Sequence, residues 1–469
     1  MKYQALHNMK TFDAIIIGSG QGGTPLAKKL AQAGLKTAII EKRFIGGTCI
    51  NDGCTPTKAM IASAKRAFLI RNSSELGIDS GDYIVNFPKV LERKNKIVQS
   101  FRESAERGLN ETENVTVMIG EAVFTGLKSI SVSSANGDLE TCTAEKIFIN
   151  TGTSPLIPDI VGIDKVKYYT STTLLDIEEI PRHLIIFGGG YIALEFAQMF
   201  KRFGSKVTII ERSSVLLKNE DEDISSCLQN ILAAEGIDIL TNTTVSKLTS
   251  AAPEIISVEM NTGGKQQTIE GSHVLIATGR IPQTAALELG KTGVATSEKG
   301  YINVDEYLQT STPGIYALGD VKGGPAFTHI SYNDYIVLLK NVLHHSNISV
   351  KGRPVPYTIF TDPQLGRVGL TEKEARLQKL NIKVVTMPMD RVARGIETGE
   401  TNGMIKAIVD ADSKLILGVA ILAAEGGEVM SVLQMAMMGN ITYQQVRETI
   451  FAHPLYSESL NNLFMSLDK

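Results

Sequence analysis

A pair of cysteines is the feature of this chain with the clearest chemistry. Cys49 and Cys54 lie between glycines and are separated by four residues. Apolar residues at helical spacing follow from Pro56 to Ile70, which predicts a helix that begins near Cys54. The unpaired N–H groups and the dipole of such a helix start favour the thiolate form of Cys54. A disulfide between the two cysteines would close a very small loop, which makes a poor structural staple but a good redox centre.

Two plainer interpretations compete with redox chemistry at this pair. The cysteines could be reduced structural residues, or they could supply half of a zinc site. The zinc interpretation lacks a second Cys or His pair at ligand spacing nearby, so we expect no metal site. Cys142 lies in a strand-like stretch, and Cys227 lies among apolar residues at helical spacing. Both are expected to be small, buried core residues.

A glycine-rich turn precedes the cysteines. A buried strand is predicted over residues 12–17, the turn occupies 18–23, a helix follows over 25–33, and a second strand covers 36–40. A glycine pattern alone is a weak signal, but this order of strand, turn, helix and strand is the context that dinucleotide binding requires. The alternative is a glycine-rich turn in an unrelated α/β protein.

The residues of this turn fit the dinucleotide fingerprint one by one. Gly18 makes the tight turn, Gly20 lets the backbone approach a pyrophosphate, and Gly23 lets helix and strand pack closely. The helix start faces the phosphates. Glu41 ends the second strand, where its carboxylate can bind the hydroxyls of an adenosine ribose.

The same order returns 170 residues later. A strand over 184–187 leads into the turn Gly188-Gly189-Gly190-Tyr191-Ile192-Ala193, and a strand over 206–210 ends at Glu211. The first glycine and the acid stand 23 positions apart in both repeats. Two matched repeats predict two bound dinucleotides, not one.

The second acid also bears on the choice of nucleotide. Glu211 favours a ribose with an unmodified 2′-hydroxyl, and therefore NADH, because a 2′-phosphate would meet a carboxylate. Arg212 follows directly and could pair with a 2′-phosphate, which leaves NADPH as the alternative.

A third motif follows the second repeat. Residues 310–320 predict a turn, a short buried strand and then Asp320 at the carboxyl end of that strand. This edge of an open α/β sheet is where ligands bind. Taken alone, the segment would be interpreted as a solvated aspartate that ends a strand.

Length and composition limit the class of protein. A chain of 469 residues predicts two to four domains. The net charge of −3 and the lack of a long basic run argue against nucleic acid and membrane surfaces as partners. No apolar run reaches the ~18 residues of a membrane span, and residues 1–10 lack a signal-peptide pattern. Four cysteines in so long a chain favour a cytoplasmic enzyme over a secreted disulfide scaffold.

Taken together, the order of these motifs resembles the flavoprotein (pyridine nucleotide-) disulfide oxidoreductases, the family of dihydrolipoamide dehydrogenase, glutathione reductase and mercuric reductase. The resemblance runs from Phe12 to Phe464. It implies an α/β fold with two Rossmann-like domains and an α+β C-terminal dimerisation domain. The implied domains are 1–152 with 276–346 for FAD, 153–275 for NAD(P), and 347–469 for the interface of a homodimer.

The resemblance also implies roles for individual residues. Cys54 would be the thiol beside the flavin and Cys49 the thiol that exchanges with substrate, while Lys58 would lie by the flavin and pair with Glu195. Tyr191 would cover the nicotinamide pocket. The residues assigned to FAD are Gly18, Gly20, Gly23, Glu41, Gly47, Thr48, Lys58, Thr151, Gly152, Gly319 and Asp320. Those assigned to NAD(P) are Gly188, Gly190, Tyr191, Ala193, Glu195, Glu211 and Gly279.

Near the end of the chain stands His453-Pro454-Leu455-Tyr456-Ser457-Glu458. A histidine taken alone is more often a satisfied surface or core residue. In the family, the same arrangement supplies an acid/base. By resemblance, His453 would move the proton of Cys49, Glu458 would hold the imidazole tautomer, and the pair would act on the redox centre of the other subunit.

The branch of the family decides the substrate. Phe360-Thr361-Asp362-Pro363 and the ending from Glu458 to Phe464 resemble mercuric-reductase-like proteins and the bacterial reactive-chlorine-resistance flavoproteins, which reduce hypothiocyanous acid. Dihydrolipoamide dehydrogenase is the alternative, although Thr55 and Thr57 differ from its pattern. Mercury(II) reductase is a further alternative, although the chain ends without the C-terminal cysteine pair of that enzyme and lacks its N-terminal metal-binding module.

Two functions outside disulfide reduction are the remaining alternatives. A flavoprotein that only binds or signals would need neither the cysteine pair nor His453 and Glu458. An NADH oxidase of this fold typically uses a single redox cysteine, whereas this chain has two at that place. We therefore expect a small oxidant or disulfide as the substrate.

Overall fold

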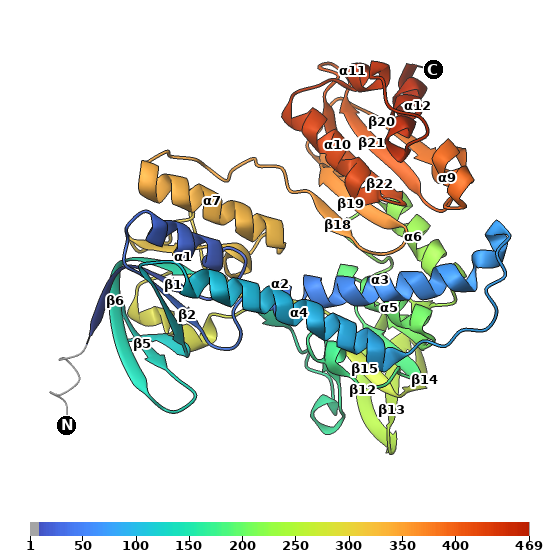
Figure 1. Cartoon of the computed structure of the whole chain (residues 1–469). Helices are drawn as coiled ribbons and strands as arrows, with labels where there is room; N and C mark the ends of the chain where they lie inside the picture. The colour runs from blue at the N-terminus through green and yellow to red at the C-terminus, as the bar shows by residue number, and fades with distance from the viewer. Residues whose placement is uncertain (1–8, 469) are drawn as a thin grey trace. The chain divides into compact units, whose positions relative to one another are not determined.

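The computed structural model describes residues 9–468 (Figure 1). Residues 1–8, which make up most of the segment inspected for a signal peptide, and residue 469 lie outside the described residues. The chain divides into two compact units. The first contains residues 9–59, 92–156 and 280–353, and the second contains 60–91, 157–279 and 354–468.

The first unit is built on a parallel sheet of apolar strands. Its order is β3-β2-β1-β6, with β17 paired to the other side of β6 and the hairpin β4-β5 extending β6 in antiparallel fashion. The strands are β1 (Lys10–Ile17), β2 (Thr37–Glu41), β3 (Val115–Ile119), β4 (Glu121–Phe124), β5 (Ser129–Ser133), β6 (Leu139–Ile149) and β17 (Ile315–Ala317). The helices are α1 (Gly23–Gln32), α2 (Gly47–Asn51), the start of α3 (Cys54–Arg71), most of α4 (Phe87–Asn110) and α7 (Thr328–His344).

Successive residues of β1 serve the two faces of this sheet. Ile16 packs with Leu26 of α1 and Leu338 of α7 in one buried cluster, whereas Ile15 and Ile17 belong to a cluster on the opposite face. A strand buried on both faces has no polar alternation, which explains the continuous apolar run that the sequence shows.

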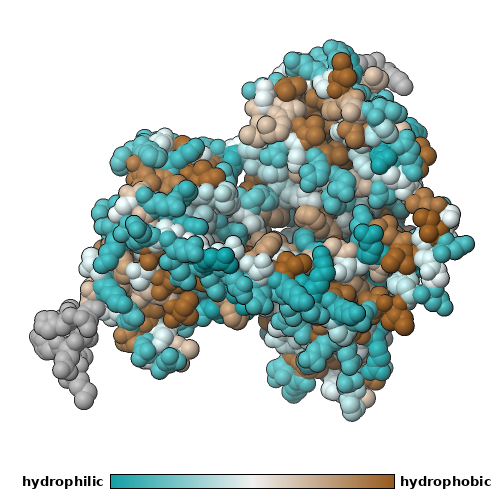
Figure 2. Space-filling view, in the orientation of Figure 1, coloured by the Kyte–Doolittle hydropathy of each residue, from teal (hydrophilic) through white to brown (hydrophobic). Residues whose placement is uncertain are grey.

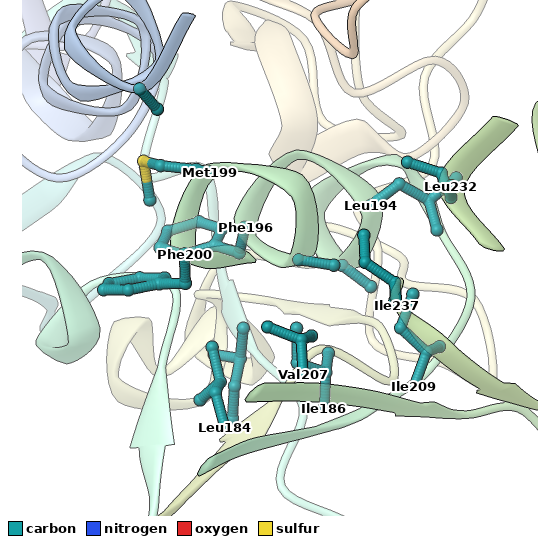
Figure 3. Close-up of a cluster of buried hydrophobic side chains, with 14 of the residues drawn as sticks. Leu184, Ile186, Leu194, Phe196, Met199, Phe200, Val207, Ile209, Leu232 and Ile237 are labelled. Carbon is teal, nitrogen blue, oxygen red and sulfur yellow. The ribbon is translucent and has the colours of Figure 1, made fainter. Parts of the chain in front are cut away.

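The second unit contains another parallel sheet, in the order β11-β10-β9-β15-β8. Its strands are β8 (Tyr169–Thr170), β9 (His183–Phe187), β10 (Lys206–Ile210), β11 (Asp238–Leu240) and β15 (His273–Ile276), and its helices are α5 (Tyr191–Phe203) and α6 (Glu222–Ala234). Figure 3 shows α5 lying over β9 and β10, with side chains of both layers such as Leu194, Phe196, Ile186 and Val207 filling the space between them. An antiparallel sheet of β12 (Thr243–Ala252), β13 (Ile255–Thr262) and β14 (Lys265–Gly271) follows β11.

The C-terminal part of the second unit is an antiparallel sheet in the order β18-β19-β22-β21-β20. Its strands are β18 (Tyr357–Ile359), β19 (Gln364–Gly369), β20 (Ile382–Pro388), β21 (Met404–Asp410) and β22 (Ile416–Ala423). Its helices are α8 (Glu372–Leu377), α9 (Ala393–Thr398), α10 (Gly426–Met438), α11 (Tyr443–Glu448) and α12 (Ser459–Met465). The expected α+β character of this part is therefore confirmed.

Residues 46–58, which contain Cys49 and Cys54, are called the redox stretch below. The two cysteines outside it differ in burial. Cys142 lies in β6 and is fully buried, as expected. Cys227 lies in α6 at the edge of the apolar core and is only half-buried, so the expectation of a buried core residue is met only in part there. The physical reason is that helical spacing identifies the apolar face of α6 but not the boundary at which the core ends.

A buried ion cluster holds α5 to the segment between β18 and β19. The Arg202 guanidinium contacts an Asp362 oxygen at 2.7 Å and both Glu235 oxygens at 2.7 and 3.0 Å, and it lies 3.9 Å from the centre of the Phe68 ring. The side chain of Arg202 is only 4% exposed. Burial alone would raise the pKa of Asp362, but Arg202 and Lys65 outweigh it and hold the pKa of that carboxyl below its usual range.

We predict that Arg202→Met lowers the free energy of unfolding by about 3–5 kcal/mol, because it leaves the partly buried Glu235 without its cation and Asp362 with only the Lys65 ammonium. Denaturant unfolding followed by circular dichroism measures this change. Arg182→Met is the matched control, because the side chain of Arg182 is 72% exposed and its ion pair with Glu254 is long, at 3.7 Å. That control should cost at most about 1 kcal/mol. Equal losses of unfolding free energy in the two variants would contradict the conclusion that the buried ion cluster of Arg202 stabilises the fold.

The same cluster predicts a loss of stability in acid. Since the pKa of folded Asp362 is depressed, its contribution is present above the unfolded value of about 3.9 and is lost as pH falls through the folded value. The melting temperature of the wild type should therefore fall more steeply below about pH 4 than that of Arg202→Met. Parallel pH profiles of the melting temperature in the two proteins would show that Asp362 contributes nothing to the loss of stability in acid.

Candidate active site

The redox stretch spans two helix starts in the first unit. Cys49 lies in α2, and α3 begins at Cys54 itself, as the sequence predicts. Gly46 precedes α2 and Gly47 is its first residue, and their φ values of +103° and +64° lie in the left-handed region that favours glycine. These two glycines therefore let the chain turn into α2, the short helix that carries Cys49.

Direct contacts tie this stretch to the first glycine-rich turn. The backbone N–H of Gly46 donates to Ser19 Oγ at 3.2 Å, and the side-chain amide of Gln21 donates to the Gly46 carbonyl at 3.2 Å. A Cβ on Gly47 would stand 2.7 Å from the Cα of Gly20. The cysteines are therefore held beside the turn that the sequence assigns to a dinucleotide.

The two thiols act on each other electrostatically. A hydrogen bond with Cys54, together with burial, raises the pKa of the Cys49 thiol, while Thr328 and the Lys58 ammonium oppose this. A thiol that donates a hydrogen bond to its neighbour keeps its own proton. The raised pKa keeps the proton on Cys49, and the start of the 18-residue helix α3 favours a negative charge at Cys54.

The first turn fits an adenine dinucleotide. Gly18 has φ of +102°, and a Cβ there would stand 2.4 Å from the Asn150 carbonyl oxygen, so no larger residue fits. Asn150 Oδ1 accepts the N–H of Gly23 at 2.9 Å. Glu41 accepts hydrogen bonds from the N–H and Oγ of Ser19 at 3.0 and 2.7 Å, which places its carboxylate at the turn.

A second group of polar residues in this unit fits the rest of such a ligand. Asp320 lies just beyond β17, and Thr153 Oγ1 donates to its carboxylate at 3.3 Å. Burial raises the pKa of Asp320, and the Arg280 guanidinium opposes this. Among residues 9–468, the buried Thr151 Oγ1 has no hydrogen-bond partner. A polyhydroxylated ligand such as the ribityl chain of FAD would satisfy both groups.

The second turn repeats the first at the level of single hydrogen bonds. Glu211 accepts the N–H of Gly189 at 2.5 Å and the N–H of Ser213 at 2.7 Å, just as Glu41 accepts from the equivalent Ser19 and Arg43. Gly188 has φ of +109°. Gly190 precedes α5, Tyr191 is its first residue, and Ala193 is fully buried in it. Arg212 is exposed.

The predicted acid/base pair also meets in space. His453 Nδ1 lies 3.0 and 3.1 Å from the two carboxylate oxygens of Glu458. An Nδ1–H that donates to this carboxylate leaves Nε2 as the basic nitrogen. The side chain of His453 is 68% exposed, so Nε2 can be reached from outside the chain.

The other predicted residues are placed as follows. Lys58 lies in the part of α3 that belongs to the first unit, whereas Glu195 lies in α5 of the second unit, so their pairing stays a prediction. Within the second unit, Glu195 Oε1 accepts the N–H of Phe360 at 2.9 Å. The remaining members of the predicted set are Thr48 in α2, Gly152 beside Thr151, Gly279 after β15 and Gly319 at the start of the turn that carries Asp320.

Sequence reasoning missed Thr328, whose Oγ1 lies 3.5 Å from Cys54 Sγ. It also missed Asn51, which accepts the Nε–H of Arg102 at 2.7 Å and donates to the carbonyls of Ile45 and Gly47, so that α2 is held to α4. Asn51 belongs to the redox stretch and could have been found by asking what stabilises so short a helix. Thr328 gave no local signal, because it is 274 positions from Cys54.

The fold and site together define a two-dinucleotide redox enzyme, and comparison with known proteins agrees. The pyridine nucleotide-disulphide oxidoreductase model matches residues 12–334, and the dimerisation domain of the same family matches residues 355–464. The chain belongs to this family. It is thus a flavoprotein disulfide oxidoreductase, and the predicted fold class and activity are confirmed.

Comparison with individual members of the family shows which of its branches this chain resembles. The chain is 39% identical over 460 residues to the probable pyridine nucleotide-disulfide oxidoreductase RclA of Escherichia coli, covering 97% of this chain and 99% of that protein. It is 32% identical to the mercuric reductase of Lysinibacillus sphaericus (99% of this chain, 84% of that one) and to the dihydrolipoyl dehydrogenase of Bacillus subtilis (97% and 98%). A solved structure described as the Cu(II) complex of the HOCl-induced flavoprotein disulfide reductase RclA matches with a TM-score of 0.89 at 38% identity, over 98% of this chain and 100% of that one.

Several coarser expectations follow from the family. The cofactors of a flavoprotein disulfide oxidoreductase are FAD and a pyridine nucleotide, and the dimerisation domain supports a homodimer. Within residues 9–468, no helix is both long and apolar enough to cross a membrane. Over the same residues, His, Cys, Asp and Glu side chains form no group of three or more that could hold a metal ion.

Proposed function

We propose that this protein carries reducing equivalents from NAD(P)H through FAD to a disulfide between Cys49 and Cys54, and from there to a small thiol-reactive oxidant or disulfide. The observation that carries the proposal is a pair of interacting thiols in a segment whose Gly46 and Gly47 contact the first dinucleotide turn. FAD supplies the two-electron chemistry that links the nicotinamide to the disulfide. The chain's own residues bind and orient the cofactors and the substrate, and they move the proton.

We propose a role for each of the chain's reactive residues. Cys54 is the thiol that keeps the charge of the reduced pair, and Cys49 is the one that attacks the substrate after losing its proton. Since hydrogen bonding and burial hold that proton on Cys49, a base must take it. His453, with Nδ1 fixed by Glu458, is that base and acts on the partner subunit's cysteine pair. We also propose that Lys58 pairs with Glu195 and that Tyr191 covers the nicotinamide.

The residues proposed to bind the cofactors are those that form the two turns and their acids. Gly18, Gly20, Gly23, Glu41, Gly47, Thr48, Lys58, Thr151, Gly152, Gly319 and Asp320 are proposed for FAD, and Gly188, Gly190, Tyr191, Ala193, Glu195, Glu211 and Gly279 for the pyridine nucleotide. We propose domain boundaries of 1–152 with 276–346, 153–275, and 347–469. The proposed compartment is the cytoplasm, since reducing conditions suit an enzyme whose cysteines must cycle.

Several exposed apolar side chains support the homodimer. Val432, Met435 and Met438 on α10 and Ile441 just after it are exposed, and they lie within the segment that matches the dimerisation domain. Figure 2 shows brown, apolar residues interrupting the teal surface of this C-terminal part. A methionine-rich helix face adapts well to a partner surface.

The substrate class we favour is an oxidant of the hypothiocyanous or hypochlorous acid type. Identity is higher to RclA, at 39%, than to the mercuric reductase and the dihydrolipoyl dehydrogenase, at 32% each. The description of RclA as HOCl-induced points to the same chemistry. The test is NADH consumption by purified holoenzyme with hypothiocyanous acid, lipoamide, glutathione disulfide, mercuric ion or cupric ion. Lipoamide as the best substrate would establish the dehydrogenase instead.

The nucleotide preference gives a separate prediction. Because Glu211 lies at the second turn and Arg212 is exposed, we expect a lower KM for NADH than for NADPH. Steady-state assays with both nucleotides measure it, and Glu211→Gln should narrow the difference. Glu41→Gln is the matched control at the first turn and should leave the ratio of the two KM values unchanged. A tenfold preference for NADPH, about 1.4 kcal/mol, would show that Arg212 dominates.

A further inference from the structure

The hydroxyl of Thr328 lies beside the redox pair although no motif marks it. Thr328 is the first residue of α7, a 17-residue helix that follows Asp320 in the chain. Its Oγ1 lies 3.5 Å from Cys54 Sγ, within hydrogen-bond distance for sulfur. The same hydroxyl opposes the rise in the pKa of the Cys49 thiol, but the hydrogen bond with Cys54 and burial outweigh it.

The first turns of α7 are held firmly in place. Ser331 is buried, and a Cβ on Gly22 would stand 2.7 Å from its Oγ, so α7 packs directly on the first dinucleotide turn. Asp334 is fully buried, accepts the N–H of Gly319 at 2.8 Å, and pairs with Arg353 at 2.7 Å and Lys322 at 3.4 Å. Figure 1 shows α7 beside α1, the helix that this turn starts. These buried contacts fix the N-terminal part of α7, the helix that begins at Thr328.

The direction of the hydrogen bond follows from charge. A thiolate can only accept, so in the reduced pair the Thr328 hydroxyl must donate to Cys54. Cys54 already has the N-terminus of α3 at its backbone. The Thr328 hydroxyl adds a side-chain donor from a second helix.

We infer that Thr328 donates a hydrogen bond to the Cys54 thiolate and thereby stabilises the negative charge of the reduced pair on Cys54. This inference rests on the proposed function, because it assumes that Cys54 is the thiol next to the flavin. It adds to that function the residue that separates the roles of two otherwise similar thiols. No bond is made or broken at Thr328, and its proton stays on its own oxygen.

The test uses holoenzyme in a Cys49→Ser background, in which only one thiol of the pair titrates. The absorbance of the long-wavelength band between a Cys54 thiolate and oxidised flavin is recorded against pH. Thr328→Val removes the hydroxyl at nearly constant volume and should move the midpoint upward by about one pH unit, a tenfold change in the ionisation constant. Thr328→Ser retains the donor and should keep the midpoint of the parent.

Each outcome decides the matter. An unchanged midpoint in Thr328→Val, or an equal shift in Thr328→Val and Thr328→Ser, would overturn the inference while leaving the proposed function intact. If Thr328→Val does not fold, Thr328→Ala takes its place, with the same expected upward shift. Absence of any pH-dependent band in the Cys49→Ser parent would instead overturn the assignment of Cys54, and the inference with it.

Discussion

Cys54→Ser should abolish both the long-wavelength absorbance of the two-electron-reduced enzyme and its turnover. The band requires a thiolate next to oxidised flavin, and the structure places Cys54 at the start of α3, in the stretch whose Gly46 donates to Ser19 of the first dinucleotide turn. Serine accepts the same hydrogen bond but neither ionises near neutral pH nor forms a disulfide. We expect turnover with oxidant substrates to fall by more than the roughly 10²–10⁴ that loss of an acid/base usually costs. Anaerobic titration with NADH, followed by spectroscopy, measures the band.

Two further variants separate the thiols. Cys49→Ser should keep the band but lose turnover, because it removes the thiol that meets the substrate and leaves Cys54. Cys227→Ser is the matched control, since Cys227 is half-buried in α6, far from the redox stretch in sequence. It should change neither property. If Cys54→Ser retains the band, the roles of the two thiols are reversed.

The parts of the fold that the sequence predicts well are those whose signal is local. The fingerprint from Gly18 to Glu41 contains the turn, the helix, the strand and the acid in one short segment of the sequence. Each of them lies where the sequence predicts it. The second copy, ending at Glu211, agrees for the same reason. Repetition strengthens such a prediction, because two copies with one spacing rarely arise from unrelated turns.

The division of the chain into two compact units is harder to predict from the sequence. Residues 60–91 belong to the second compact unit although they follow the redox stretch directly, and α3 passes from one unit into the other. Met60 and Phe87 join the core around Phe200, which is more than a hundred residues away. Apolar spacing along α3 says that a face is buried but not which sheet covers it.

The site shows the same contrast between local and distant information. Cys49, Cys54, His453 and Glu458 are recognised from residue type and short spacing. The donors and acceptors that orient them are distant: Asn150 accepts from Gly23 across 127 positions, and Thr328 reaches Cys54 across 274. Such polar partners leave no periodic pattern, because one hydrogen bond needs only one residue on each side.

His453→Ala should lower turnover by about 10²–10⁴, the usual scale for general acid–base catalysis. The histidine lies on the dimerisation domain, with Nδ1 held by Glu458 and the ring 68% exposed, so its basic nitrogen can serve a second subunit. Reduction of the flavin by NADH should survive, because that step does not need this proton. Stopped-flow spectroscopy separates the two half-reactions. His345→Ala is a matched control with an exposed histidine just beyond α7, and it should leave turnover unchanged.

Mixing two inactive variants tests the shared site directly. In a heterodimer of Cys49→Ser and His453→Ala subunits, one of the two sites combines an intact cysteine pair with an intact His453 from the partner, while the other site lacks both. Partial activity should therefore return, up to about half of the wild-type value per heterodimer, since one site in two is complete. Mass spectrometry of the intact dimers must show that subunits have exchanged. If they have and no activity returns, His453 acts on its own chain or outside catalysis, because a site shared between subunits cannot fail this complementation.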